Sequence, residues 1–145
     1  MIYMAKYPLP RQLYIISGVP GSGKSTLARA LIVAGLADRH YEADQFFVSG
    51  TMYKFDPTKI TEAHEWCMNQ TWQAMRKCLN VVVSNTFTKD VFLKHYLDMA
   101  REYEYNVVEI VMKSKFKSEH DVPLETVARM KLQLQERLNN DWVMK

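Results

Sequence analysis

Short apolar runs alternate with stretches of helical periodicity along this chain. The run Val81-Val82-Val83 shows no alternation with polar residues, which is typical of a strand buried on both faces of a sheet. From residue 58 to residue 79, small and apolar side chains recur at helical spacing, which predicts a long helix. Applied to the whole chain, these patterns predict four strands, over 12–17, 39–43, 80–84 and 106–112. They also predict four helices, which run from the glycine-rich loop at 18–26 to about residue 35, over 58–79, over 88–103 and from about residue 121 onward.

The predicted elements follow one another as strand, helix, strand, helix, strand, helix, strand, loop and helix. Strands that alternate with helices favour an α/β fold, with a parallel four-stranded sheet and helices on both faces. Ligands of such sheets bind outside the carboxyl ends of the strands. We therefore expect functional residues directly after the predicted strands, at 18–25, 44, 85–87 and 113–117.

Proline and capping residues set the predicted boundaries. Two prolines oppose helix formation at the start of the chain, so residues 1–11 are expected to form a short leader within a single domain that spans 1–145. Thr88 and Asp121 are the predicted N-caps of the third and fourth helices. Residues 44–57 are predicted to form a loop rich in aromatic rings, which either face a substrate or close the core beneath the loop.

Composition indicates a globular chain. It has 145 residues, of which 48% are hydrophobic, so it can bury one core, and its net charge of +3 does not by itself imply nucleic acid. Cys67 and Cys78 fall in one predicted helix, too far apart for a disulfide, so we expect free thiols and a reducing cytoplasm. No apolar stretch predicts a membrane span, and the first residues lack the layout of a signal peptide.

A glycine-rich loop follows the first predicted strand. Residues 18–26 read Gly-Val-Pro-Gly-Ser-Gly-Lys-Ser-Thr, which matches the pattern G-x-x-x-x-G-K-S of a phosphate-binding loop between a strand and a helix. The backbone N–H groups of such a loop bind phosphate, its lysine reaches the β- and γ-phosphates, and its serine ligates Mg²⁺. The residues expected to bind ATP are Gly18, Gly21, Ser22, Gly23, Lys24, Ser25 and Thr26.

Asp44 is the strongest acidic candidate, because it follows the second predicted strand. A carboxylate above the phosphate site can orient an acceptor hydroxyl and take its proton, and it can also hold Mg²⁺ through water. The alternative is a carboxylate that caps a helix or lies on the surface of a loop. We predict the functional role, with Asp44 as general base and with Asp44 and Ser25 as the metal residues.

Two further candidate sites follow the third and fourth predicted strands. Asn85 stands where many P-loop proteins place an aspartate for Mg²⁺, and it either orients the substrate or the catalytic carboxylate, or makes a local turn hydrogen bond. Lys113, Lys115 and Lys117 form a basic segment that is either a lid over the transferring phosphoryl group or a solvated loop. Arg129 on the last predicted helix is another candidate for a cation that faces the phosphates.

Six stretches of the chain carry recognisable motifs, at 18–26, 42–47, 53–56, 62–66, 82–86 and 120–123. Taken in this order, they resemble the kinase domain of the polynucleotide kinase-like P-loop family, which includes phage enzymes and small stand-alone relatives. The resemblance implies a three-layer P-loop kinase fold with a short basic lid, in an AAA-like ATP-binding domain. It also implies that Lys24 and Ser25 bind the triphosphate and Mg²⁺, and that Asp44 is the general base. The lid would supply Lys115 and Lys117 as catalytic cations.

The chain departs from the phage enzymes of this family in its lid, which is short and holds lysines instead of arginines, and at two single positions. Phe47 stands where those enzymes have an arginine that contacts the phosphate of the acceptor, and Asn85 stands where they have an aspartate. Kinase chemistry is therefore expected to carry over better than a 5′-hydroxyl polynucleotide acceptor. Both positions are predicted to face the substrate, and a hydroxymethylpyrimidine in DNA is a second acceptor, whose base would suit the aromatic segment.

The function that the sequence predicts is an ATP- and Mg²⁺-dependent kinase of a hydroxyl on a nucleic acid or nucleotide, in a bacterial or phage-infected cytoplasm. One alternative is a kinase of a small metabolite, because the same loop and base would serve it. Another is a nucleotide-binding module without transfer activity. The residues Phe47 and Asn85 favour this module, whereas intact Lys24, Ser25 and Asp44 argue against it.

Overall fold

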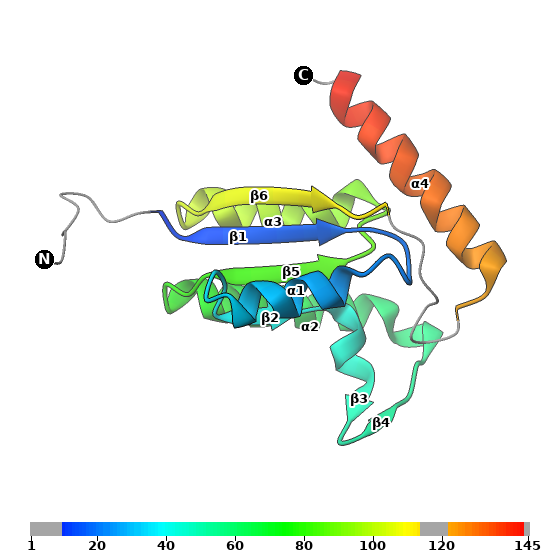
Figure 1. The fold of residues 1–145 in the computed structure, drawn as a ribbon, viewed down its shortest axis with the longest axis horizontal. Coiled ribbons are helices and arrows are strands. Elements are labelled where there is room, and N and C mark those ends of the chain that lie inside the picture. Colours follow the sequence, from blue (N-terminus) through cyan, green and yellow to red (C-terminus); the bar gives the residue numbers. More distant parts are fainter. Residues whose placement is uncertain (1–9, 114–121, 144–145) are drawn as a thin grey trace, which may run out of the picture.

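Four strands form one parallel sheet at the centre of the molecule. The computed structural model describes residues 10–113 and 122–143. The strands are β1 (Gln12–Ser17), β2 (Arg39–Tyr41), β5 (Val81–Asn85) and β6 (Asn106–Val111), and their order across the sheet is β2-β5-β1-β6 (Figure 1). Each strand is parallel to its neighbours, so the carboxyl ends lie along one edge of the sheet. This confirms the predicted α/β architecture.

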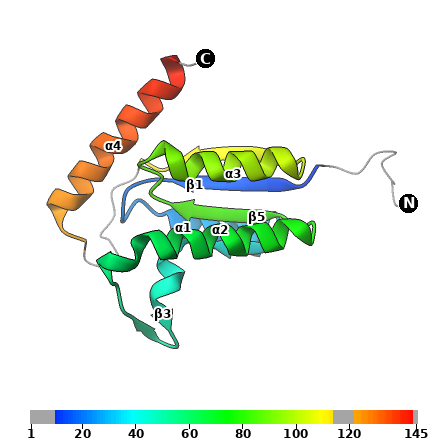
Figure 2. The ribbon, with the colours of Figure 1, turned by 180° about the vertical axis from the view of Figure 1, so that it is seen from behind.

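Helices cover both faces of the sheet. The helix α1 (Lys24–Val33) lies on one face, and α2 (Ile60–Arg76) and α3 (Asp90–Glu102) lie on the other, as Figures 1 and 2 show from opposite sides. The last helix, α4 (Leu124–Val143), lies beyond the carboxyl edge of the sheet. Across residues 10–113 and 122–143, no helix has the length and apolar character needed to cross a membrane.

The hydrophobic core has two parts, one on each face of the sheet. Beneath α1, Ile16 and Val82 pack with Ala28. On the opposite face, Ile15 and Val83 pack against residues of α2 and α3. Successive residues of each strand thus point to opposite faces, and both faces are apolar. This double burial explains why the sequence of β5 is continuously apolar before its polar end.

Residues 44–57 do not form the simple loop that the sequence predicts. This stretch overlaps the 3-10 helix η1 (Ala43–Phe47) and contains an antiparallel hairpin of β3 (Val48–Ser49) and β4 (Met52–Tyr53). A second 3-10 turn, η2 (Pro57–Lys59), leads into α2. Gly50 has a φ of 62°, which permits the tight turn of the hairpin. The hairpin projects below the carboxyl edge of the sheet in Figure 1.

The strand β2 is shorter than predicted, and this changes the place of Asp44. The strand ends at Tyr41, so Asp44 lies in η1 rather than directly after a strand. The reason is a long-range contact, because the N–H of Ala43 donates to Oδ1 of Asn85 at 2.8 Å instead of continuing the ladder with β5. Asp44 is therefore held beside the end of β5 by a side chain and not by strand pairing.

Two of the predicted helix boundaries are wrong. The N-cap of α3 is Lys89 rather than Thr88, and no side chain caps this helix. The helix α2 ends before Cys78, which has a φ of 59°, so the two cysteines do not share a helix, although both are free thiols as predicted. The predicted cap Asp121 lies outside the described residues, as does most of the predicted lid, at 114–121.

A buried arginine ties α4 to the edge of the sheet. Arg137 is 3% exposed, and its Nη2 donates to Glu109 Oε1 on β6 at 3.0 Å and to Ser17 Oγ at the end of β1 at 3.4 Å. Leu134, one turn earlier, is also buried, whereas Leu124 at the start of the helix is 87% exposed. The apolar side chains of α4 are thus covered only in part, and Arg137 provides a polar anchor.

We expect Arg137→Gln to lower the free energy of unfolding by about 1–3 kcal/mol, because the buried contacts to Glu109 and Ser17 lose a charged donor. Chemical denaturation followed by circular dichroism measures this change. Lys131→Gln, on the exposed side of the same helix, is the matched control and should change stability by less than about 0.5 kcal/mol. Equal stability of the Arg137 variant and the wild type would contradict the anchoring role.

Candidate active site

The phosphate-binding loop folds tightly between β1 and α1. Gly21 and Gly23 have φ angles of 80° and 91°, a backbone region that favours glycine. A side chain at Gly18 would collide with the hydroxyl of Ser22. The loop therefore needs glycine at the fixed positions of the motif, and Gly23 leads directly into the N-terminus of α1, where backbone N–H groups can bind an anion.

The side chain of Lys24, the predicted phosphate-binding lysine, lies against the glycine-rich loop. Its Nζ donates to the carbonyl of Val19 at 3.0 Å. Burial lowers the pKa of Lys24, and the charges of Glu42 and Asp44 act in the opposite direction. The structure therefore brings the lysine of the loop and two carboxylates from the segment after β2 within electrostatic reach of one another.

Glu42 lies at the centre of this site, although the sequence patterns did not single it out. Its Oε2 accepts hydrogen bonds from Ser25 Oγ at 2.8 Å and from Ser84 Oγ at 3.0 Å, and it lies 3.6 Å from His40 Nε2. His40 Nε2 is in turn 2.7 Å from Ser84 Oγ. Glu42 thus joins the first turn of α1 to β2 and β5. The only signal in the sequence was its position two residues before Asp44.

Hydrogen bonds keep the carboxylate of Glu42 ionised. Burial by itself would raise its pKa, but the neighbouring imidazole of His40 and hydrogen bonds from Ser25 and Ser84 lower the pKa to about 2. Because the pKa in the folded state lies below the ordinary value of 4.5, Glu42 stabilises the fold above about pH 4.5, and this contribution is lost as the pH falls toward 2. At neutral pH the site therefore contains a fixed negative charge beside Ser25.

Asp44 is held by a tyrosine from the neighbouring hairpin. Tyr53 donates its hydroxyl to Asp44 Oδ1 at 3.2 Å. Burial raises the pKa of Tyr53, and the charge of Asp44 raises it further, so the phenol remains a neutral donor. Asp44 itself is half-buried. A carboxylate oriented in this way can take a proton from a hydroxyl bound at the edge of the sheet.

Asn85 is turned toward the backbone of η1. Its Oδ1 accepts the hydrogen bond from Ala43, its Nδ2 donates toward Cys67 Sγ at 3.7 Å, and the side chain is 6% exposed. This amide fixes the start of the turn that carries Asp44. Its contacts therefore favour a role in orienting the carboxylate of Asp44. A direct contact between Asn85 and a substrate stays a prediction.

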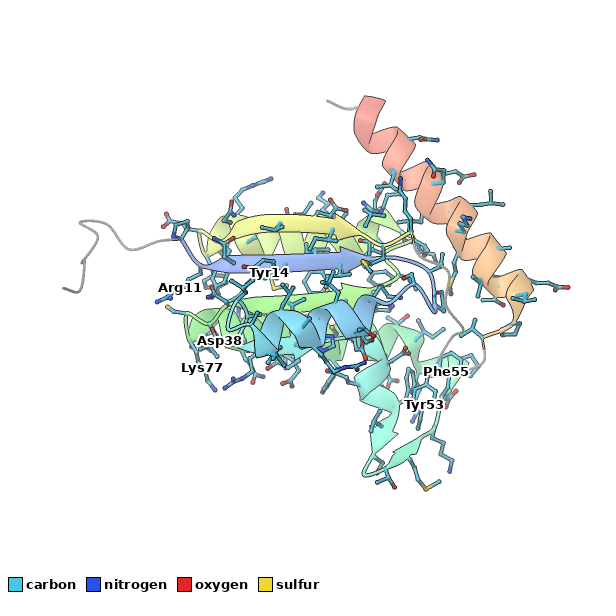
Figure 3. The ribbon with its side chains drawn as sticks, in the orientation of Figure 1. Arg11, Tyr14, Asp38, Tyr53, Phe55 and Lys77 are labelled. Atoms are coloured by element: carbon cyan, nitrogen blue, oxygen red, sulfur yellow. The ribbon has the colours of Figure 1, made fainter. Side chains whose placement is uncertain are left out.

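Phe47 belongs to a cluster of aromatic rings beneath the hairpin. It is 7% exposed, and its ring centroid lies 5.4 Å from that of Phe46, 5.2 Å from that of Phe55 and 6.4 Å from that of Tyr53. Tyr53 and Phe55 lie on the hairpin side of the molecule in Figure 3. Phe55 is 51% exposed, so it offers more surface to a partner than Phe47 does. A substrate contact by Phe47 stays a prediction.

The structure describes only some of the basic side chains that were predicted to face the transferring phosphoryl group. Lys113 is exposed just after β6, whereas Lys115 and Lys117 lie outside the described residues. Arg129 is exposed on α4. The arginine that reaches the carboxyl edge of the sheet is Arg137, whose guanidinium contacts the last residue of β1, directly before the loop. Which cation faces the transferring group stays a prediction.

The residues beside the loop fit a Mg²⁺ ion that is bound together with phosphates. Among the described residues, no group of three or more His, Cys, Asp or Glu side chains could form a complete metal site. Mg²⁺ usually keeps several waters and binds through one or two protein oxygens plus the phosphates of a substrate. Ser25, beside the carboxylate of Glu42 and with Asp44 nearby, provides oxygen donors of this kind.

Known proteins that resemble the chain identify its family. Residues 13–115, more than half of the chain, match the family model of the AAA domain. The "Putative bifunctional polynucleotide kinase/RNA ligase" of Autographa californica nuclear polyhedrosis virus is 28% identical over 131 residues, which cover 83% of this chain and 18% of that protein. The chain belongs to the polynucleotide kinase-like P-loop family of AAA domains.

Similarity to other known proteins extends over much of the chain. NEDD4-binding protein 2 of Homo sapiens is 32% identical over 97 residues, which cover 66% of this chain and 6% of that protein. A chain in the solved structure of the Pnkp1/Rnl/Hen1 RNA repair complex matches with a TM-score of 0.70 at 19% identity, over 93% of this chain and 47% of that chain. The chain thus spans less than half the length of these proteins, and the structural match confirms the P-loop kinase fold.

In this family member, we expect Asn85→Asp to destabilise the fold, although phage members have aspartate at this position. The new carboxylate would be almost fully buried near the charge of Glu42, and it would lose the donor toward Cys67. The midpoint of thermal unfolding should fall by about 5 °C. Asn69→Asp, exposed on α2, is the control and should leave the midpoint unchanged. An unchanged midpoint for Asn85→Asp would show that this position tolerates a buried carboxylate and does not need the amide donor.

Proposed function

We propose that the chain is an ATP- and Mg²⁺-dependent kinase that transfers the γ-phosphoryl group to a hydroxyl of a nucleic acid or nucleotide. Membership in a P-loop kinase family supports the kinase chemistry. The observation that carries the proposal is the position of Asp44, which is held in η1 within electrostatic reach of Lys24. A general base and the phosphate-binding lysine can therefore act on the same reacting groups.

The loop is proposed to bind the triphosphate through the backbone and Lys24. The N-terminus of α1 attracts phosphate oxygens through its N–H groups and its dipole. Lys24 would exchange its contact with the Val19 carbonyl for the β- and γ-phosphates. Because Lys24 is largely removed from water, its attraction for a phosphate is strengthened. Mg²⁺ held beside Ser25 would draw negative charge from the phosphates.

Asp44 is the proposed general base for the acceptor hydroxyl. As the hydroxyl oxygen bonds to the γ-phosphorus, the bond from this phosphorus to the β–γ bridging oxygen breaks, and ADP leaves with the electron pair. The proton of the hydroxyl passes to the Asp44 carboxylate. Tyr53 fixes one oxygen of this carboxylate and so orients it. Lys115 and Lys117 are proposed to neutralise the transferring group, with Arg129 as the alternative cation.

The proposed acceptor class draws support from relatives. One relative is named as a polynucleotide kinase/RNA ligase, and one structural match belongs to an RNA repair complex. Phe47 replaces the arginine that contacts the acceptor in phage enzymes, so the acceptor would be held differently here, at a 5′-hydroxyl end or at a hydroxymethylpyrimidine. The exposed ring of Phe55 beside exposed Lys54 suits a stacked base and its phosphate.

A small-metabolite kinase is the second candidate. The burial of Phe47, at the position where the phage enzymes have an arginine for the phosphate of the acceptor, favours this candidate. Dependence on acceptor length separates the two. A polynucleotide acceptor should be phosphorylated faster than its mononucleotide, and its binding should weaken steeply with salt, because counterions are released from the phosphates. Equal rates for both acceptors, with little effect of salt, would favour the small acceptor.

We expect Asp44→Asn to lower the rate of phosphoryl transfer by about 100-fold or more, because the amide cannot accept the proton. The affinity for ATP should change little. Transfer from labelled ATP and calorimetric titration with ATP measure the two effects separately. Asp98→Asn, exposed on α3, is the control and should transfer at the wild-type rate. Unchanged transfer by Asp44→Asn would show that Asp44 is not the base.

Lys24→Ala should weaken both ATP binding and transfer. Loss of a charged donor to the phosphates predicts a decrease in affinity of about 10-fold or more, measured by calorimetry with Mg²⁺ present. Lys94→Ala, which removes an exposed lysine from α3, should bind ATP as the wild type does. Normal binding and transfer by Lys24→Ala would overturn the assignment of the loop as the triphosphate site.

A further inference from the structure

Three polar groups converge on Glu42, which has no assigned part in the transfer step. We infer that Glu42 is a positioning residue for Mg²⁺-bound ATP, which orients the hydroxyl of Ser25 toward the ion and accepts hydrogen bonds from the waters of the ion. This inference rests on the proposed function, because it concerns the same triphosphate site. The carboxylate that orients the ion would then come from Glu42, in the segment after β2.

The hydrogen bond between Ser25 and Glu42 sets the direction of the hydroxyl. Ser25 Oγ lies 2.8 Å from Glu42 Oε2, and an ionised carboxylate can only accept, so the serine donates its proton to Glu42. The lone pairs of Oγ then point away from the carboxylate and are available to a cation. Without this acceptor, the hydroxyl could rotate and present its proton to the ion. Glu42 therefore prepares Ser25 as a metal ligand.

Glu42 is itself held in place from the sheet. Ser84 of β5 donates to Oε2 at 3.0 Å, and His40 of β2 lies 3.6 Å from the same oxygen. Among the residues that the structure describes, these contacts and that of Ser25 all use Oε2. The second oxygen, Oε1, is the one that would accept from water on the ion. Residues outside the first coordination shell commonly orient metal ligands in this way.

The end of β5 offers no carboxylate for this task. Many P-loop proteins place an aspartate there for Mg²⁺, but the residue here is Asn85, whose amide is committed to Ala43 and Cys67. Glu42 reaches the loop serine from the position directly after the neighbouring strand β2 instead. Its carboxylate is held there by hydrogen bonds from Ser25 and Ser84. The site thus has a negative group beside Ser25 without an aspartate on β5.

The affinity of the chain for ATP, measured by calorimetry with Mg²⁺ and with EDTA, tests this role. Mg²⁺ should tighten ATP binding by the wild type. In Glu42→Gln, this Mg²⁺-dependent gain should fall by about 10-fold or more. ATP binding in EDTA should stay equal or become tighter, because a negative charge near the phosphates is removed. A distorted loop would weaken binding under both conditions, so the split separates positioning from a loss of structure.

Matched variants complete the experiment. Glu62→Gln, exposed on α2, should keep the full Mg²⁺-dependent gain. Ser84→Ala retains the carboxylate and removes one of its hydrogen bonds, so it should show a smaller loss of the gain. Circular dichroism reports whether each variant is folded. If Glu42→Gln does not fold, Ser84→Ala and Glu42→Asp decide the question, since both keep the charge but alter its position.

An unchanged Mg²⁺-dependent gain in Glu42→Gln would overturn the inference and leave the proposed kinase intact. If Glu42→Gln does not fold, an unchanged Mg²⁺-dependent gain in both Ser84→Ala and Glu42→Asp would likewise overturn the inference and leave the proposed kinase intact. A wild-type chain that binds ATP equally well with and without Mg²⁺ would also overturn it. Failure of the wild type to bind ATP at all would instead overturn the proposed function and, with it, this inference.

Discussion

One half-buried carboxylate connects the phosphate-binding loop to the sheet. Glu42 Oε2 accepts hydrogen bonds from Ser25 at the start of α1 and from Ser84 on β5, and it lies beside His40 on β2. Burial of a charge is unfavourable unless hydrogen bonds compensate for it, so these contacts fix the three segments relative to one another. The geometry of the proposed triphosphate site depends on this arrangement.

A second constraint places the proposed base beside that loop. The amide of Asn85 holds the N–H of Ala43, which starts the 3-10 helix η1, and Tyr53 from the hairpin orients Asp44 within it. The position of the carboxylate is therefore set by side chains from two other elements. An acceptor hydroxyl can be activated only where such a carboxylate and the phosphates of ATP lie at one edge of the sheet.

Features that depend on local sequence could be predicted, and features that depend on distant partners could not. The apolar run 81–83 and the spacing of the loop glycines indicated the sheet and the phosphate site, because each signal lies within a few residues. The turn that carries Asp44 and the hydrogen bonding of Glu42 depend on partners 42 residues away in the chain, at the end of β5. The burial of Phe47 likewise depends on rings of the hairpin that follows it.

The measurement that tests the central claim most directly is transfer of label from γ-labelled ATP, with Mg²⁺, to a panel of acceptors. The panel contains DNA and RNA with free 5′-hydroxyl ends, 5′-blocked DNA with hydroxymethylpyrimidines, nucleosides, nucleotides and sugars. The account predicts label on a hydroxyl of a nucleic acid or nucleotide. Label on sugars alone would contradict the proposed acceptor class. Label on no member of the panel, from a protein that still binds ATP, would contradict the kinase itself.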